Sequence, residues 1–218
     1  MKPLKTELQD AETLRDLGSA SVQIVHDLKN QLNGLKLYAT FLRKRMEKAE
    51  RPADEQETLA KLISGLERAA ADMNVLVRFG RALELRTKPG TDLARLLQES
   101  AEGASVEADG GPFEGDFDPV LLAEALKNIT AGAFGESGAA PDGAGPQHVR
   151  LSGDGSKAVV EWRGAAPGAG GAEEDPFRGL AGAAGLRMAL AAKIVRAHGG
   201  EVSSEGGRIR ARLPLQEP

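Results

Sequence analysis

The chain has 218 residues, 41% hydrophobic and 4% aromatic, so it is long enough for one or two small domains with cores of Leu, Ala, Val and Ile. It has no cysteine, which excludes disulfides and thiolate metal sites, and no apolar run of about 18 residues that could span a membrane. Residues 1–90 hold 16 basic and 13 acidic side chains, and residues 91–218 hold 12 basic and 19 acidic ones. Neither half has the basic stripe of a nucleic-acid binder. We therefore expect a cytoplasmic protein without a nucleic-acid partner and without membrane insertion.

Residues 5–49 are predicted to form one long amphipathic helix. Apolar or small residues recur at alternating steps of three and four, a spacing typical of the seam of a helical bundle. The repeat runs through Leu14, Leu17, Ser21, Ile24, Leu28, Leu35, Tyr38 and Leu42, with Gln31 in the remaining slot.

A second helix is predicted from about Asp54 to Arg86, after a turn at Arg51-Pro52-Ala53-Asp54. Its apolar or small positions repeat in the same way: Leu59, Leu62, Leu66, Ala69, Met73, Leu76, Gly80 and Leu83. Two such helices form an antiparallel hairpin, which alone would expose a long apolar face. We therefore predict a homodimer with a four-helix bundle; the alternative is a monomeric hairpin covered by the C-terminal half.

The second half of the chain has a mixed pattern and follows a predicted linker at Lys88-Pro89-Gly90. The fold class is thus α+β, with a helical-hairpin domain at 1–88 and an α/β sandwich at 91–218. Helices are expected at Thr91–Glu102 (Thr91 as N-cap), Pro119–Phe134 and Leu180–Ala197, and strands at Ser105–Ala108, His148–Ser152, Lys157–Trp162, Glu201–Ser204 and Arg208–Leu213.

The residues with the clearest chemistry are on the first helix. His26 falls two positions after the seam residue Ile24 and should face solvent, with Asn30 one turn later on the same face. A neutral imidazole is a nucleophile near pH 7, and the carboxylate of Asp27 can take or orient its proton. The Asn30 amide can hydrogen-bond a phosphoryl oxygen or a water. The three indicate a phosphoryl-accepting histidine; a solvated surface histidine is the alternative.

His26-Asp27-x-x-Asn30 resembles the H-box of the dimerisation and phosphotransfer domain of bacterial histidine kinases. The element order of the second half resembles the Bergerat-type ATP-binding domain of that family, and the best local match is GLRMALAAKIVRAHGGEVSSEGG at its end. His148 and His198 are predicted to be structural, and Trp162 to be in the core.

Three nucleotide-binding elements of that family are altered here. Asn128 is kept, but Gly132 stands where the family has its metal-binding Asn. Gly164, or Arg163 if the alignment slips, replaces the adenine-reading Asp. In the turn that is Gly-Leu-Gly-Leu in the family, Gly185-Leu186-Arg187-Met188 has an Arg for the second Gly.

The resemblance implies a histidine phosphotransfer protein that passes phosphoryl groups between His26 and receiver-domain aspartates without binding ATP. His26 is the expected nucleophile, Asp27 the base or orienting group, and Asn30 the phosphoryl or water contact. We expect no cofactor on this chain and magnesium on the receiver partner. The expected partners are response-regulator receiver domains and a second copy of the chain, and an upstream hybrid kinase is a further candidate. The alternatives are an ATP-dependent histidine kinase lacking its own sensor domain and a non-catalytic pseudokinase scaffold.

Overall fold

The computed structural model describes Val25 and residues 28–44, 53–101, 103–134, 147–163, 176–177, 182–205 and 208–216. The chain divides into two compact units, Met1–Ala82 and Leu83–Pro218. Within the described residues, no helix is long and apolar enough to cross a membrane.

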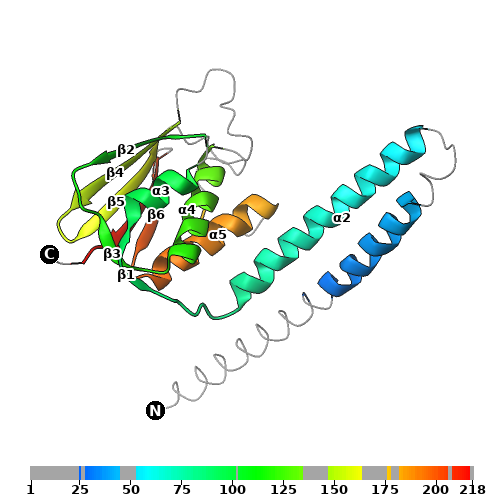
Figure 1. Ribbon diagram of the computed structural model, residues 1–218, viewed down its shortest axis with the longest axis horizontal. Helices are drawn as coiled ribbons and strands as arrows, with labels where there is room; N and C mark the ends of the chain where they lie inside the picture. The colour runs from blue at the N-terminus through cyan, green and yellow to red at the C-terminus, as the bar shows by residue number, and fades with distance from the viewer. Residues whose placement is uncertain are drawn as a thin grey trace, which may run out of the picture. The chain divides into compact units, whose positions relative to one another are not determined.

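The first unit is the predicted helical hairpin. Residues 28–44 are helical, and α2 (Ala53–Gly80) runs back along them (Figure 1). Ala39 of the first helix is buried with Leu59 and Ile63 of α2, and Lys36 Nζ lies 2.9 Å from Glu67 Oε1. Burial of these apolar side chains stabilises the pairing more than the exposed ion pair does.

The predicted end of α2 lies too far along the chain. The helix stops at Gly80 and not at Arg86, and residues 82–87 form neither helix nor strand. Glycine is a poor helix former, and the N–H of Arg86 donates to Asp118 Oδ2 (2.8 Å) and so makes no helical bond.

The second unit is an α/β sandwich (Figure 1). A five-stranded sheet has the order β2-β4-β5-β7-β6, parallel between β2 and β4 and antiparallel elsewhere; β1 and β3 form a separate antiparallel pair. The bounds are β1 Lys88–Asp92, α3 Leu93–Ser100, β2 Ser105–Asp109, β3 Glu114–Phe117, α4 Pro119–Phe134, β4 His148–Asp154, β5 Lys157–Arg163, α5 Gly182–Ala197, β6 Glu201–Glu205 and β7 Arg208–Pro214.

The core lies between the helices and one face of the large sheet. Alternate residues of β4, β5 and β7 are fully buried, including Leu151, Trp162 and Leu213. The indole N–H of Trp162 donates to Thr130 Oγ1 of α4 (2.9 Å), so the polar atom of this large side chain is satisfied inside the core. The prediction that Trp162 is a core residue is confirmed.

Two local predictions in the second unit were wrong. Lys88-Pro89-Gly90, expected to be a linker, belongs to strand β1, which pairs with β3. The N-cap of α3 is Asp92 and not Thr91, because Asp92 Oδ1 accepts hydrogen bonds from the N–H groups of Ala94 (2.9 Å) and Arg95 (3.3 Å).

His198 has the structural role that was predicted. It is buried at the end of α5, where its Nε2 accepts the N–H of Asp118 (3.0 Å) and its Nδ1 lies 2.8 Å from the carbonyl oxygen of Ile194. Nδ1 therefore carries the proton. Gly199 closes the helix with φ +74°, a left-handed conformation suited to glycine.

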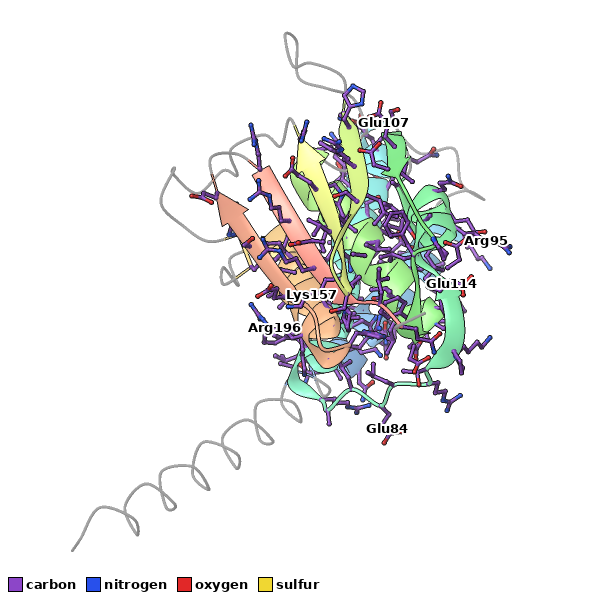
Figure 2. All side chains as sticks on the ribbon, turned by 90° about the vertical axis from the view of Figure 1, so that its left-hand side faces the viewer. Glu84, Arg95, Glu107, Glu114, Lys157 and Arg196 are labelled. Atoms are coloured by element: carbon purple, nitrogen blue, oxygen red, sulfur yellow. The ribbon has the colours of Figure 1, made fainter. Side chains whose placement is uncertain are left out.

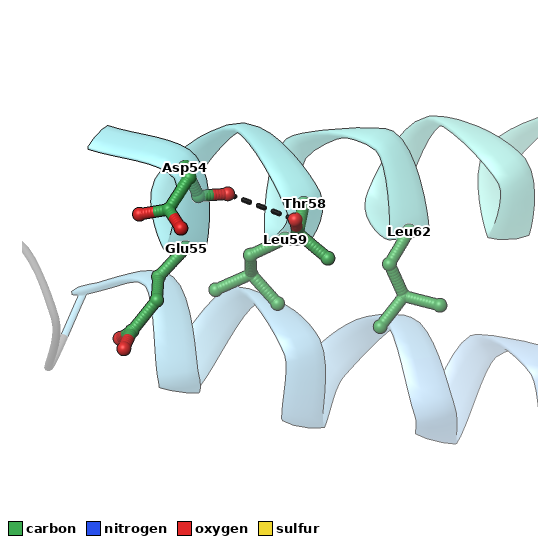
Figure 3. A pocket seen from close by; sticks show the side chains of 5 residues that line it. All are labelled: Asp54, Glu55, Thr58, Leu59 and Leu62. Atoms are coloured by element: carbon green, nitrogen blue, oxygen red, sulfur yellow. Dashed lines mark hydrogen bonds between the residues drawn. The ribbon is translucent and has the colours of Figure 1, made fainter. Parts of the chain in front are cut away.

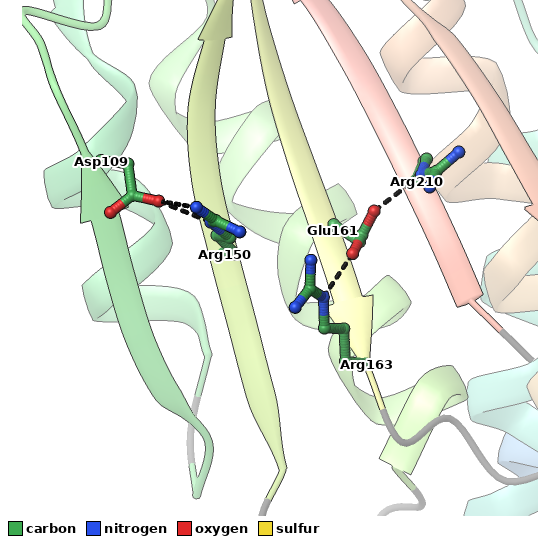
Figure 4. A network of polar contacts seen from close by, with 5 residues as sticks. All are labelled: Asp109, Arg150, Glu161, Arg163 and Arg210. Carbon is green, nitrogen blue, oxygen red and sulfur yellow. Dashed lines mark hydrogen bonds and ion pairs between the residues drawn. The ribbon is translucent and has the colours of Figure 1, made fainter.

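Charged side chains cover the outside of the second unit, among them Arg95, Glu107 and Arg196 (Figure 2). On the sheet face away from the helices, Glu161 of β5 lies between Arg163 and Arg210 and pairs with both, and Arg150 pairs with Asp109 (Figure 4). Although burial raises the pKa of Glu161, the hydrogen bonds from Arg210 and Arg163 outweigh it and hold that pKa below its ordinary value.

Replacing Glu161 with Gln should destabilise the second unit by about 1–2 kcal/mol at neutral pH, because two arginines lose a shared carboxylate. A depressed folded-state pKa means that this stabilisation is present above the unfolded value of about 4.3 and is lost as the pH falls through the folded pKa. Urea unfolding at neutral and acidic pH checks this, with Glu201→Gln, at an exposed acid that also contacts two basic side chains, as the matched control. An equal effect of Glu161→Gln at both pH values would contradict it.

Candidate functional site

The candidate phosphoryl-accepting residues lie at the start of the hairpin. Asn30 is an exposed residue of the first helix, as the amphipathic pattern predicted. His26 and Asp27 lie outside the described residues, so their roles as nucleophile and as base or orienting group stay predictions. Asn33, one heptad after His26 in the sequence, is exposed on the helix, which is the environment predicted for that heptad position.

Among the described residues of the hairpin, one group of apolar side chains is buried and another is exposed. Ala39 of the first helix and Leu59, Ile63 and Val77 of α2 are buried. Of the predicted seam positions, Leu59 belongs to this buried group, whereas Leu28, Leu35 and Leu42 of the first helix are 42%, 54% and 54% exposed. On α2, Leu62 and Leu76 are exposed at the same heptad spacing. One face of each helix is thus satisfied by the hairpin and a second apolar face remains open.

Two further apolar side chains are exposed outside the seam. Leu37 and Phe41 are 62% and 72% exposed, and Leu37 lies seven residues after Asn30, which puts both on one side of the helix. The sequence interpretation missed these two residues; the signal was an apolar pair off the seam repeat, about two to three turns beyond Asn30.

The structure explains what Gly132 does in α4. A Cβ atom at this position would lie 2.8 Å from Cγ of Met188, and closer still to its Sδ. Met188 of α5 is buried, so it fills the space next to Gly132 that a larger residue would need. The position that the sequence resemblance aligns with the metal-binding Asn of the family therefore has no ligand atom, and a side chain there would have to displace the end of Met188. No local sequence pattern predicts this proximity, because the two residues are on different helices.

The other altered elements are described in part. Asn128 is half-buried on α4, and Gly185-Leu186-Arg187-Met188 are all residues of helix α5. Arg163 ends β5 and donates to Glu161, so its guanidinium is held on the sheet. Gly164 lies outside the described residues. Among the residues that are described, no group of three His, Cys, Asp or Glu side chains could hold a metal ion.

Restoring an amide at position 132 should be unfavourable on its own. Gly132→Asn is expected to destabilise the protein by about 1–3 kcal/mol, because its Cβ overpacks against Met188. Met188→Ala should make room, so the double variant should be more stable than the sum of the two single effects predicts. Urea unfolding of the four proteins of this cycle measures the coupling, and strict additivity would show that the two side chains do not compete for the same space.

A surface pocket lies near the turn of the hairpin, between α2 and the first helix (Figure 3). It is lined by Asp54, Glu55, Thr58, Leu59 and Leu62, and the hydroxyl of Thr58 donates to the carbonyl of Asp54 (2.8 Å). This pocket is several turns of α2 away from the level of Asn30 and does not contribute to the candidate site.

No protein-family model and no curated protein matches the sequence. Solved structures do match. Full-length ShkA in complex with AMPPNP aligns with 90% of this chain and 45% of its own, at TM-score 0.64 and 21% identity. The histidine kinase ThkA in complex with the response regulator TrrA aligns with 98% of this chain and 66% of its own, at TM-score 0.57 and 14% identity. The Acinetobacter baumannii histidine kinase AdeS covers 86% of this chain and 97% of its own, at TM-score 0.52 and 12% identity.

The chain spans less than half the length of ShkA and about two thirds of the ThkA chain. At such identities the likeness establishes the fold. The described elements and these matches agree on the order, a helical hairpin followed by a mixed α/β sandwich. The chain therefore has the fold of a histidine kinase core, in which the helical hairpin comes first and the α/β sandwich second.

Proposed function

We propose that the chain is a histidine phosphotransfer protein of a two-component pathway, which exchanges phosphoryl groups between His26 and receiver-domain aspartates without binding ATP. The observation that carries the second part of this proposal is that Met188 occupies the space that a side chain at Gly132 would need. The nucleotide site of the resembled family would here lack its metal-binding Asn on α4, so less of the charge of a triphosphate would be offset there. The first part rests on His26-Asp27-x-x-Asn30 in a kinase-type hairpin.

In the proposed transfer, a nitrogen of His26 attacks the phosphorus of a receiver aspartyl phosphate, and the carboxylate of the receiver leaves. Asp27 takes or orients the proton of the other ring nitrogen, and the Asn30 amide donates to a phosphoryl oxygen. Magnesium comes with the receiver. The reverse step returns the phosphoryl group to a second receiver.

A receiver partner is supported by two observations. The match to ThkA comes from a structure of that kinase with the response regulator TrrA. Leu37 and Phe41 are exposed on the first helix beyond Asn30, off the seam, so they are available to a partner when the seam is covered. Leu37→Ser should therefore slow transfer from a receiver while the dimer stays intact.

The homodimer is part of the proposal. The open seam of Leu28, Leu35 and Leu42, with Leu62 and Leu76 on α2, is the apolar face that a second hairpin would cover in a four-helix bundle.

A second candidate is an ATP-dependent histidine kinase, because the match to ShkA comes from a complex with the nucleotide analogue AMPPNP. Isothermal titration calorimetry with ATP and magnesium separates the two. We expect no binding at micromolar ligand, because loss of the metal-binding Asn and of the adenine-reading Asp, at about 1–3 kcal/mol each, lowers affinity by roughly thirtyfold or more. A dissociation constant for ATP in the low micromolar range would support an ATP-dependent kinase instead. A pseudokinase scaffold instead predicts that signalling survives replacement of His26.

A further inference from the structure

The segment between α2 and β1, residues 81–87, which we call the connector, crosses the boundary between the two units, and its residues from Leu83 onward belong to the second unit. It forms neither helix nor strand, but its side chains alternate: Leu83 and Leu85 are half-buried, whereas Glu84 and Arg86 are exposed. Glu84 projects away from the second unit (Figure 2). This alternation is that of an extended chain with one side packed on a surface.

Asp118, just before α4, makes the polar contact that holds this segment. Its side chain is buried, with 5% of the residue exposed. Oδ1 accepts the N–H groups of Val120 and Leu121 (3.0 Å each) and caps α4, while Oδ2 accepts the N–H of Arg86 (2.8 Å). One carboxylate therefore closes the helix and binds the connector. Burial raises the pKa of Asp118, but the hydrogen bonds from Leu121, Arg86 and Val120 outweigh it and keep that pKa below its ordinary value, so both oxygens are acceptors at neutral pH.

We propose that Asp118 is a latch: its bond to the Arg86 N–H fixes the connector to the second unit and confines the hinge between the two units to residues 81–82. An extended chain reaches about 3.4 Å per residue, so a two-residue hinge spans about 7 Å. Release of the latch frees the connector up to β1, seven residues, and extends the reach to about 24 Å. The latch thus sets how far the second unit moves from the hairpin, whichever reaction the hairpin performs.

Asp118→Asn tests the latch selectively. The asparagine keeps Oδ1 as a helix cap, which Asn provides as well as Asp, but presents an NH₂ donor where Oδ2 accepted the Arg86 N–H. The backbone bond from Asp118 to His198 is retained. Asp92→Asn is the matched control, because Asp92 caps α3 with one oxygen in the same way and neither of its hydrogen bonds reaches the connector.

The first readout is amide hydrogen exchange in the full chain. In Asp118→Asn the Arg86 amide should exchange about tenfold faster or more, because its hydrogen bond to a charged acceptor is lost. In Asp92→Asn it should exchange as in the wild type. Equal exchange of Arg86 in the two variants would overturn the latch.

The second readout is the spread of distances between the units. The chain has no cysteine, so Gln56→Cys on α2 and Gln98→Cys on α3, both exposed, give one spin-label pair. Labelled chain is diluted with unlabelled chain so that pairs within one chain dominate the double electron–electron resonance signal. The distribution should broaden by several ångström in Asp118→Asn and not in Asp92→Asn; faster exchange of Arg86 without broadening would overturn the hinge assignment.

A second pair of variants changes the donor of the same hydrogen bond, the N–H of Arg86. This pair keeps the proposal testable if Asp118→Asn does not fold. Arg86→Pro removes the donor N–H, whereas Arg86→Ala keeps it and removes only the exposed side chain. Broadening in Arg86→Pro alone supports the latch, and identical distributions in the two would contradict it.

Discussion

Leu35→Asp is expected to convert the protein from dimer to monomer at micromolar concentration. Leu35 is the central residue of the open seam, and 54% of it is exposed in the single chain. In the proposed four-helix bundle the new carboxylate is buried against an apolar partner, at a cost of several kcal/mol for each copy unless it is neutralised. Sedimentation velocity measures the change in mass.

The structure provides a control two residues away. Asn33 is exposed on the outer side of the same helix, so Asn33→Asp adds the same charge without entering the seam and should remain dimeric. Because Leu35 is not part of the core within the hairpin, the circular dichroism of Leu35→Asp should stay helical. A dimeric Leu35→Asp, or a monomeric wild type, would refute the bundle.

His26→Ala is expected to abolish phosphoryl acceptance while leaving the dimer intact. The imidazole is the proposed nucleophile and alanine has no atom to replace it, so labelling should fall below detection and not merely slow down. His148→Ala is the matched control, because it removes a partly exposed histidine at the start of β4 and should accept phosphoryl groups as the wild type does. The product should be acid-labile and base-stable, as phosphohistidine is. Labelling that persists in His26→Ala would show that another residue accepts the phosphoryl group.

Much of the fold could be predicted because its signals are local. The periodic apolar spacing predicted the hairpin, and Gly199 marked the end of α5. Strand β4 alternates in burial at its start, and the apolar residues Ala158, Val160 and Trp162 of β5 are buried at alternate positions, as a short strand pattern predicts. The seam on the first helix was predicted, and the structure leaves it exposed in the single chain.

The remaining features depend on contacts between residues far apart in the sequence. Strand β1 contains Pro89 and Gly90, which locally indicate a break, and exists because β3 pairs with it. The end of α2 and the path of the connector depend on Asp118, and the filled space at Gly132 depends on Met188. No periodicity within one element reports such pairs. The candidate histidine, in contrast, was recognised from a short local motif.

The central claim is that His26 takes its phosphoryl group from a receiver and not from ATP. The most direct measurement offers the purified full chain two labelled donors in parallel: ATP with magnesium, and a receiver domain phosphorylated on its aspartate. Label on the chain is then quantified, with His26→Ala beside the wild type. The proposal predicts label from the receiver only, dependent on His26. Label on His26 from ATP, with or without transfer from the receiver, would contradict it.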